Sequence, residues 1–319
     1  MMELASFLVA YSNYIVVYSN YIENKNSPSM VKGNVMEWKY QTIQRDGFDF
    51  LIAQNKTIGP NLYWLGSALY YPRVIPEEMA SQYHITVVDH RGFANRIDPT
   101  SENESTYDLD LVLDDFYFFQ NQLEIPACTI LGHSGHGYMA LTYAKKYPNS
   151  VNTLVMVATG PNHGVPLLER ETYFVSFATE ERKEKHRQLQ NKFQNLIESH
   201  PEGLPNFFNL FCVSQDALGF YDLKMDSTHL WDGVRTNKLA FDYLFGKVFV
   251  EINVENYLST LKLPIQLILG KYDFQVAPYY TWDTIIERFP GVKRTVLDQC
   301  GHLPFFEDPI RFMQVLDSE

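Results

Sequence analysis

The feature that most constrains the fold is a regular alternation of short apolar runs with helix-length segments. NLYWLG at 61–66, HITVVD at 84–89 and ACTILG at 127–132 are short runs dominated by apolar residues. Between them, residues 109–122 repeat apolar side chains at three- and four-residue steps, which is the period of a helix. This alternation predicts an α/β fold with a mostly parallel central sheet and helices on both faces.

A block without this rhythm interrupts the alternation. Between residues 161 and 256 the chain has long polar helical patterns, such as TEERKEKHRQLQNKFQNLIESH at 179–200, and few strand signals. The strand rhythm returns with LPIQLILG at 263–270. We therefore expect a core formed by residues 36–160 and 257–319, with residues 161–256 inserted as a helical cap over the site.

Residues 1–35 form an N-terminal extension of uncertain role. The segment MELASFLVAYSNYIVVYSNYIE is fairly apolar, but Ser and Asn interrupt it throughout and no basic residue precedes it. It is therefore a poor signal peptide and a poor membrane span.

The net charge and the cysteine spacing limit which binding partners and which kinds of site the chain is expected to have. The formal net charge of −12 gives no overall field that would attract nucleic acid or an anionic membrane. Cys128, Cys212 and Cys300 lie far apart without a CxxC pair, a pattern that fits neither a disulfide framework nor a zinc site. We expect a cytoplasmic protein that binds no metal and acts on a small molecule or short peptide; the oligomeric state stays open.

Three polar residues stand just past the carboxyl ends of predicted strands, where open α/β sheets bind their ligands. Ser134 follows the strand in TILGHSGHG and directly precedes a predicted helix, so it lies on a sharp strand-to-helix turn. Asp273 follows LPIQLILG, and His302 follows KRTVLD. The order Ser, Asp, His, with the helical block between serine and acid, predicts a nucleophile, acid and base triad.

The turn at Ser134 departs from the G-x-S-x-G consensus at one position. Gly132 fits, but His136 stands where the second glycine is expected, and Gly137 follows it. We interpret His136 as a packed histidine that the flanking glycines allow; a group that supports the serine is the alternative. His133 is expected to lie beside the turn.

With these motifs, the chain resembles the α/β-hydrolase superfamily from about residue 36 to the C-terminus. The resemblance is carried by LGHSGHG, VVDHRGFA, LGKYDFQVAP and CGHLPFFEDP. Within the superfamily the chain is most similar to the proline iminopeptidase-like hydrolases of peptidase family S33. The matching GHxPxxExP fragment comprises Gly301, His302, Pro304, Glu307 and Pro309. The resemblance implies the α/β-hydrolase fold and a serine hydrolase that uses a Ser-His-Asp triad and no cofactor.

The expected oxyanion hole has one donor on each of two loops. The Gly135 N–H is the first, because it lies at the start of the helix after the nucleophile. Alignment of YWLGSA on the family's usual strand ending puts the second at the Ala68 N–H, with Ser67 as the near alternative. This loop reads LGSALYYP, whereas proline iminopeptidases usually carry His-Gly-Gly-Pro-Gly there.

Substrate contacts are expected from the loop after residue 66 and from the cap. They combine aromatic lining with acids that could hold a free α-amine: Tyr70, Tyr71, Phe211, Phe220, Tyr221, Asp222, Asp226 and Trp231. The leading hypothesis is cleavage of a small amide or N-terminal peptide bond through an acyl-enzyme. A carboxylesterase or lactonase acting on a small ester is the alternative, and a non-catalytic small-molecule binder of the same fold is a further one.

Overall fold

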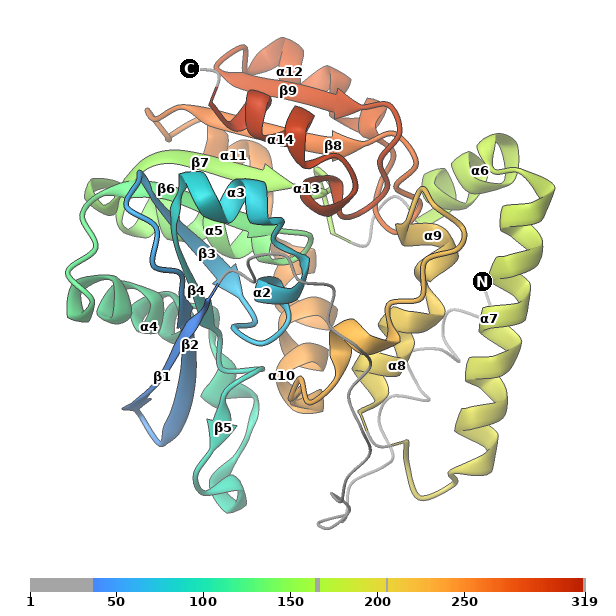
Figure 1. Cartoon of the computed structure of the whole chain (residues 1–319), viewed down its shortest axis with the longest axis horizontal. Helices are drawn as coiled ribbons and strands as arrows, with labels where there is room; N and C mark the ends of the chain where they lie inside the picture. The colour runs from blue at the N-terminus through green and yellow to red at the C-terminus, as the bar shows by residue number, and fades with distance from the viewer. Residues whose placement is uncertain (1–36, 164–166, 205, 318–319) are drawn as a thin grey trace.

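The computed structural model describes residues 37–163, 167–204 and 206–317 (Figure 1). The predictions for the N-terminal extension at 1–35 lie outside these residues. The first described element is a hairpin of β1 (Lys39–Arg45) and β2 (Phe48–Gln54). Asp46 and Gly47, which join the strands, have φ values of +48° and +78°, the conformation that Asp-Gly favours in a two-residue hairpin turn.

The central sheet runs in the order β1-β2-β4-β3-β6-β7-β8-β9, and the short strand β5 (Asn95–Arg96) pairs with β2. β1 and β2 are antiparallel to each other, β2 is antiparallel to β4, and all later neighbours are parallel. The remaining strands are β3 (Asn61–Gly66), β4 (His84–Asp89), β6 (Cys128–His133), β7 (Val151–Val157), β8 (Ile265–Gly270) and β9 (Val292–Leu297). The predicted mostly parallel sheet is confirmed.

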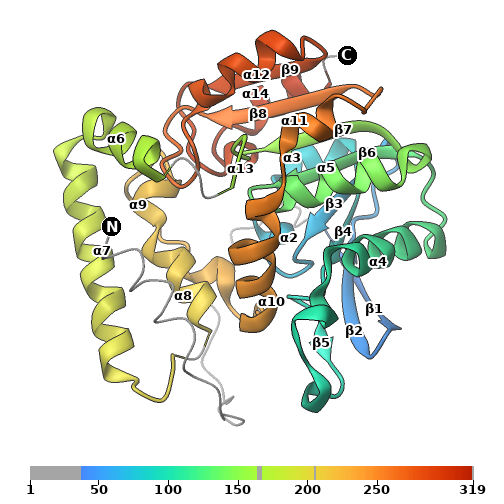
Figure 2. The same cartoon turned by 180° about the vertical axis from the view of Figure 1, so that it is seen from behind.

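Helices cover both faces of this sheet (Figures 1 and 2). α4 (Leu109–Gln122) and α5 (His136–Lys146) pack on one face together with α11 (Val254–Leu258) and α12 (Asp283–Arg288). The other face carries α2 (Tyr71–Val74), α3 (Glu77–Gln82), α13 (Pro304–Glu307) and α14 (Pro309–Leu316).

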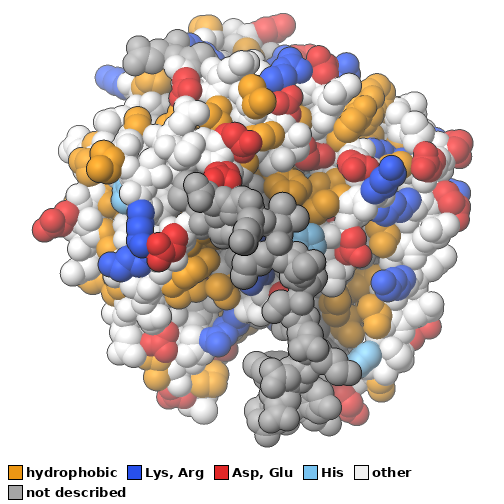
Figure 3. Space-filling view, in the orientation of Figure 1, with side chains coloured by type: hydrophobic (Ala, Val, Ile, Leu, Met, Phe, Trp, Pro, Cys, Tyr) orange, Lys and Arg blue, Asp and Glu red, His pale blue; other side chains and the backbone are white. Residues whose placement is uncertain are grey.

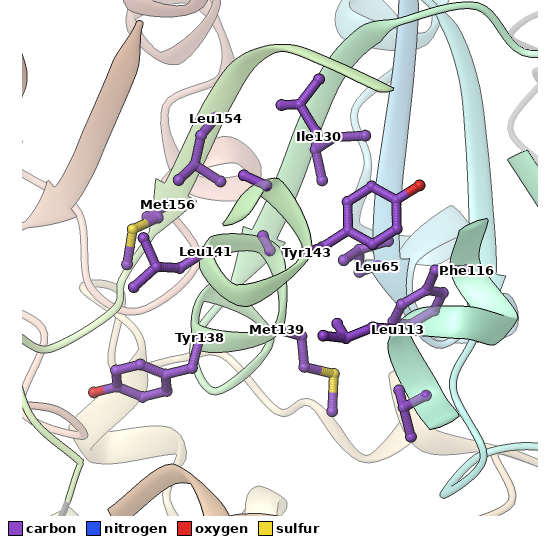
Figure 4. Close-up of a cluster of buried hydrophobic side chains, with 14 of the residues drawn as sticks. Leu65, Leu113, Phe116, Ile130, Tyr138, Met139, Leu141, Tyr143, Leu154 and Met156 are labelled. Carbon is purple, nitrogen blue, oxygen red and sulfur yellow. The ribbon is translucent and has the colours of Figure 1, made fainter. Parts of the chain in front are cut away.

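Alternate residues of each strand enter one core or the other, because successive strand side chains point to opposite faces. Leu154 and Met156 of β7 belong to the cluster with α4 and α5, whereas Val155 belongs to the cluster with α3 and α14. Figure 4 shows the first cluster, in which Met139 of α5 and Phe116 of α4 lie in the same buried layer. α5 is thereby held rigidly on the sheet, and its N-terminus fixes the position of Ser134.

The segment between β7 and β8 is helical, as predicted. Its described residues form α6 (Leu167–Phe177), α7 (Glu180–Ser199), α8 (Phe207–Ser214), α9 (Asp216–Gly219) and α10 (Lys238–Tyr243), with shorter helical turns and no strand, before α11 leads into β8. Both views place α7 on the opposite side of the molecule from α4. In the part of the chain that the structure describes, no helix has the length and apolarity needed to cross a membrane.

Candidate active site

Ser134 occupies a strained turn between β6 and α5. Its φ is +58°, a left-handed conformation that non-glycine residues rarely adopt and that persists only where surrounding contacts enforce it. Two contacts do so. The Ser134 N–H donates to Val157 O at 2.8 Å, and Thr159 Oγ1 donates to Ser134 O at 3.0 Å. The turn is therefore fixed by β7 and the residues that follow it.

The glycines around Ser134 explain why His136 is tolerated. A Cβ on Gly132 would lie 2.1 Å from His136 O, and a Cβ on Gly137 would lie 2.0 Å from Thr159 Oγ1. The close approach of helix to sheet therefore requires glycine at the second position before and the third position after Ser134. His136 itself is buried, with 7% exposure, and burial lowers its pKa to about 4.

The structure brings Asp273 and His302 together. Asp273 lies in the loop after β8 and His302 in the loop after β9. His302 Nδ1 is 2.7 Å from Asp273 Oδ2, and both side chains are buried. The other carboxylate oxygen of Asp273 accepts the Gln275 N–H at 2.9 Å. Both oxygens are thus engaged, which fixes the carboxylate and orients the imidazole.

Ser134 and His302 line the same cavity, which has a volume of about 370 Å³. Among the described residues, Ser134 Oγ and His302 Nε2 form no hydrogen bond; such contacts often tighten only when substrate binds. In Figure 3, hydrophobic side chains gather near the centre of the face, between the sheet and the side on which Figure 1 places α7.

The second oxyanion donor is predicted at Ala68, with Ser67 as the alternative. The Ala68 N–H already donates to Asp89 Oδ1 at 2.7 Å, and Ala68 does not line the cavity, so the structure does not support Ala68 as a free donor. Asp89 is buried at the end of β4, and burial raises its pKa to about 7. Ser67, the alternative, does line the cavity, as does Gly135. Within the described chain, neither of their backbone N–H groups has a hydrogen-bond acceptor.

Five of the eight predicted substrate contacts line the cavity: Tyr70, Tyr71, Phe211, Phe220 and Trp231. Tyr70 and Trp231 are in ring contact, with centroids 4.3 Å apart, and this contact joins the loop after β3 to the insertion.

Tyr221, Asp222 and Asp226 do not line the cavity, so the structure gives these three predictions no support. The carboxylates of Asp222 and Asp226 are exposed and accept backbone N–H groups two residues further on, from Lys224 and Thr228. Tyr221 packs edge-on against the Tyr272 ring and is 37% exposed. Local turn bonding, which Asp favours in loops, accounts for both acids.

The cavity contains two charged residues that the sequence analysis did not select. Asp216 of α9 is buried and accepts from the Ser227 Oγ at 2.6 Å and from the Ser227 N–H at 2.9 Å. Burial raises the pKa of Asp216. Arg170 of α6 also lines the cavity. No local motif surrounds either residue, so only the packing of the insertion identifies them.

A buried chain of hydrogen bonds lies beneath the turn that carries Ser134. His133 Nε2 is 2.8 Å from His302 O, and since a carbonyl can only accept, this nitrogen carries the proton. His133 Nδ1 then accepts from the Tyr71 hydroxyl at 3.2 Å, which in turn accepts from His136 Nδ1 at 3.1 Å. These neutral histidines link the turn to the backbone of His302, and burial lowers the pKa of His133.

Glu307 of the GHxPxxExP fragment joins the His302 loop to the insertion. Its carboxylate accepts the N–H groups of Gly301 and Tyr221. Burial raises its pKa to about 7, although both hydrogen bonds favour the charged form. The His302 N–H also donates to Gly219 O at 2.6 Å, so the insertion holds the loop that carries His302 at two points. Across the described residues, no group of three or more His, Cys, Asp or Glu could hold a metal ion.

The chain is similar in sequence and in fold to known proteins. A family model described as alpha/beta hydrolase fold matches residues 64–309. The chain is 35% identical over 270 residues to the AB hydrolase superfamily protein YclE of Bacillus subtilis, covering 84% of this chain and 94% of that protein. It is 23% identical over 267 residues to the pimeloyl-[acyl-carrier protein] methyl ester esterase of Aeromonas hydrophila, covering 81% and 94%. The proline iminopeptidase structure from Mycobacterium smegmatis aligns with a TM-score of 0.60 at 14% identity, over 87% of this chain and 96% of that one.

Proposed function

Since the chain belongs to the α/β-hydrolase family, we propose that it is a serine hydrolase in which Ser134, His302 and Asp273 form the catalytic triad. The observation that carries the proposal is the buried 2.7 Å contact between His302 Nδ1 and Asp273 Oδ2, which faces the same cavity as Ser134. An unreactive serine would need neither a strained turn nor an oriented imidazole beside it.

The reaction proceeds through an acyl-enzyme. His302 Nε2 takes the proton from Ser134 Oγ as the oxygen attacks the carbonyl carbon, and then gives that proton to the departing alcohol or amine. Asp273 orients the imidazole and stabilises its cation. Water, deprotonated by His302, then attacks the acyl-enzyme, releases the acid and restores Ser134.

The Gly135 and Ser67 N–H groups form the proposed oxyanion hole. Both residues line the cavity and both N–H groups lack an acceptor within the described chain. Backbone donors aimed at a developing oxyanion stabilise the transition state more than the ground state, and losing one costs about 3–4 kcal/mol of barrier. Asp89 supports this arrangement by engaging the neighbouring Ala68 N–H, which holds the loop in place.

For the substrate, we propose a small amide or N-terminal peptide bond, cleaved in the manner of a proline iminopeptidase. Such an enzyme needs an anion for the free α-amine, and Asp216 is the carboxylate of the insertion that lines the cavity. Its raised pKa is lowered again when a cationic amine approaches. The insertion at 161–256 acts as the cap that selects this substrate.

An esterase or lactonase acting on a small ester is the second candidate. It is supported by the aromatic lining of the cavity, including Tyr70 and Trp231, and by the similarity to a methyl ester esterase. An apolar acyl group would bury its surface against these rings without requiring an amine.

Paired substrates separate the candidates. Initial rates with proline naphthylamide and with a short acyl ester are measured for the wild type and for Ser134→Ala. The proposal expects the naphthylamide to be cleaved in preference, with both activities lost in the variant. Cleavage of the ester alone would favour the esterase, and no cleavage by folded protein would favour a non-catalytic binder.

A further inference from the structure

Arg170 carries a guanidinium group into the lining of the cavity. It extends from α6, is half-buried, and its Nη1 donates to the Gln275 carbonyl at 3.3 Å. Among the described residues, no carboxylate forms an ion pair with it. Burial lowers its pKa, while the charges of Glu171 and Asp273 act in the opposite direction. A guanidinium has five N–H donors, and the described residues accept from one of them, at the Gln275 carbonyl.

Asp273 does not satisfy Arg170. One of its oxygens accepts from His302 Nδ1 and the other from the Gln275 N–H. The carboxylate is therefore occupied by the base and by its own loop. A half-buried cation whose neighbouring acid is engaged elsewhere has a desolvation cost that an anionic ligand would offset.

Arg170 lies on the side of the site where the leaving group departs. The leaving group takes its proton from His302, and therefore occupies the region next to the His302 and Asp273 loops. Arg170 contacts that region directly, since Gln275 lies two residues after Asp273 and both Gln275 and Arg170 line the cavity. The side-chain amides of Gln275 and Asn162 provide further hydrogen-bonding groups in the same lining.

We propose that Arg170 binds a carboxylate on the leaving group of the substrate. The preferred substrates are then esters or amides whose leaving group is a hydroxy acid, an amino acid or a short peptide with a free C-terminus. A planar carboxylate matches the paired N–H groups of a guanidinium. This inference rests on the proposed serine-hydrolase function and adds the chemistry of the departing half of the substrate.

The test compares substrates that differ only in that charge. The pairs are 4-butyryloxybenzoate with 4-butyryloxybenzamide, and prolylglycine with prolylglycinamide; kcat/KM is measured for each compound. The wild type is expected to prefer the carboxylate of the pair that it cleaves by about tenfold or more. Arg170→Gln brings this ratio close to one, and Arg170→Lys retains part of it.

A matched control is Arg187→Gln, since Arg187 is an exposed residue of α7 paired with Glu184 and does not line the cavity. It should keep the wild-type ratio. Three results would overturn the proposal: a wild-type ratio near one, a ratio retained in Arg170→Gln, or an equal loss on both members of the pair. The last would mean that Arg170 supports Asp273 and does not bind substrate.

A binding measurement separates failure of this inference from failure of the proposed function. Calorimetry with Ser134→Ala, alone and combined with Arg170→Gln, gives the affinity for the same four compounds without turnover. Tighter binding of the carboxylates that depends on Arg170 supports the inference even if the wild type cleaves none of them. Equal affinities contradict it even if Ser134 proves reactive.

Discussion

The two walls of the cavity differ in the contacts that fix their residues and in how far those residues can be identified from the sequence. The wall formed by the sheet carries Ser134 after β6 and His302 after β9, and Asp273, in the loop after β8, lies against His302. The wall formed by the insertion carries Asp216, Arg170 and a set of aromatic rings. The first is fixed by close backbone contacts and the second by side-chain packing. We infer that chemistry belongs to the first wall and selection of substrate to the second.

The largest expected effect concerns the proposed triad, on the wall formed by the sheet. Asp273→Asn should lower kcat by about 10⁴-fold, because an amide favours the wrong tautomer of His302. The thermal unfolding midpoint should change little, since the substitution preserves shape. The matched control is Asp298→Asn, at an exposed acid paired with Lys271 after β9, which should leave kcat intact. Near-normal turnover in Asp273→Asn would place the catalytic acid elsewhere.

Substitution of glycine by alanine tests how tightly the backbone is packed at the Ser134 turn and in the insertion. Gly137→Ala should destabilise the fold by about 1–3 kcal/mol, because the new Cβ would lie 2.0 Å from Thr159 Oγ1. Gly246→Ala in the insertion should be neutral or stabilising, since no atom lies within 4 Å of the added Cβ. Denaturant unfolding of both variants measures the difference. Equal stabilities would contradict the tight helix-to-sheet contact at the nucleophile turn.

Asp216→Asn should alter selection of substrate. If Asp216 holds a free α-amine, KM for proline naphthylamide should rise by roughly tenfold or more, since a buried charge-assisted contact is lost. Asp222→Asn, at an exposed acid outside the cavity, is the control and should leave KM unchanged. A rise in both variants, or in neither, would remove the assigned role of Asp216.

Glu307 links the two walls and predicts a pH dependence of stability. Its pKa is raised to about 7 in the folded protein, so between pH 4.5 and 7 the folded state binds more protons than the unfolded state. The contribution of Glu307 to the free energy of unfolding is therefore largest below pH 4.5 and is lost as pH rises through 7. Glu307→Gln should flatten this slope in denaturant titrations across that range, and an unchanged slope would exclude Glu307 as its source.

The smallest expected effect concerns the hydrogen-bond chain beneath Ser134. Tyr71→Phe removes the hydroxyl between His133 and His136 and should cost about 1 kcal/mol of stability. It should lower kcat several-fold with KM unchanged, because the chain ends at the backbone of His302 and the substitution keeps the ring that lines the cavity. Tyr117→Phe, at a partly exposed residue of α4, is the control. A change in KM alone would assign Tyr71 to substrate binding.

The contrast between the walls also explains what the sequence could predict. The parallel sheet follows from apolar periodicity, and Ser134, Asp273 and His302 follow from their places after strands, because both signals are local. The sequence could not distinguish Ser67, the proposed donor, from Ala68, since the choice depends on which N–H reaches Asp89, a residue of another strand.

The sequence pattern could not predict which acidic residues of the insertion line the cavity. Asp216 and Asp222 are six positions apart, yet one lines the cavity and the other caps a turn in solvent. The orientation of short helices such as α9 is set by contacts with α7, where Arg182 donates to the carbonyls of Ala217 and Phe220. The division of the chain into a core and a cap at 161–256 stays a prediction.

The central claim is that Ser134 is an activated nucleophile, and fluorophosphonate labelling of the intact protein tests it most directly. Mass spectrometry should show one adduct on the folded wild type and none on Ser134→Ala, because only a serine activated by a neighbouring base reacts readily with the reagent. An adduct that persists in Ser134→Ala, or no adduct on folded wild type, would contradict the account.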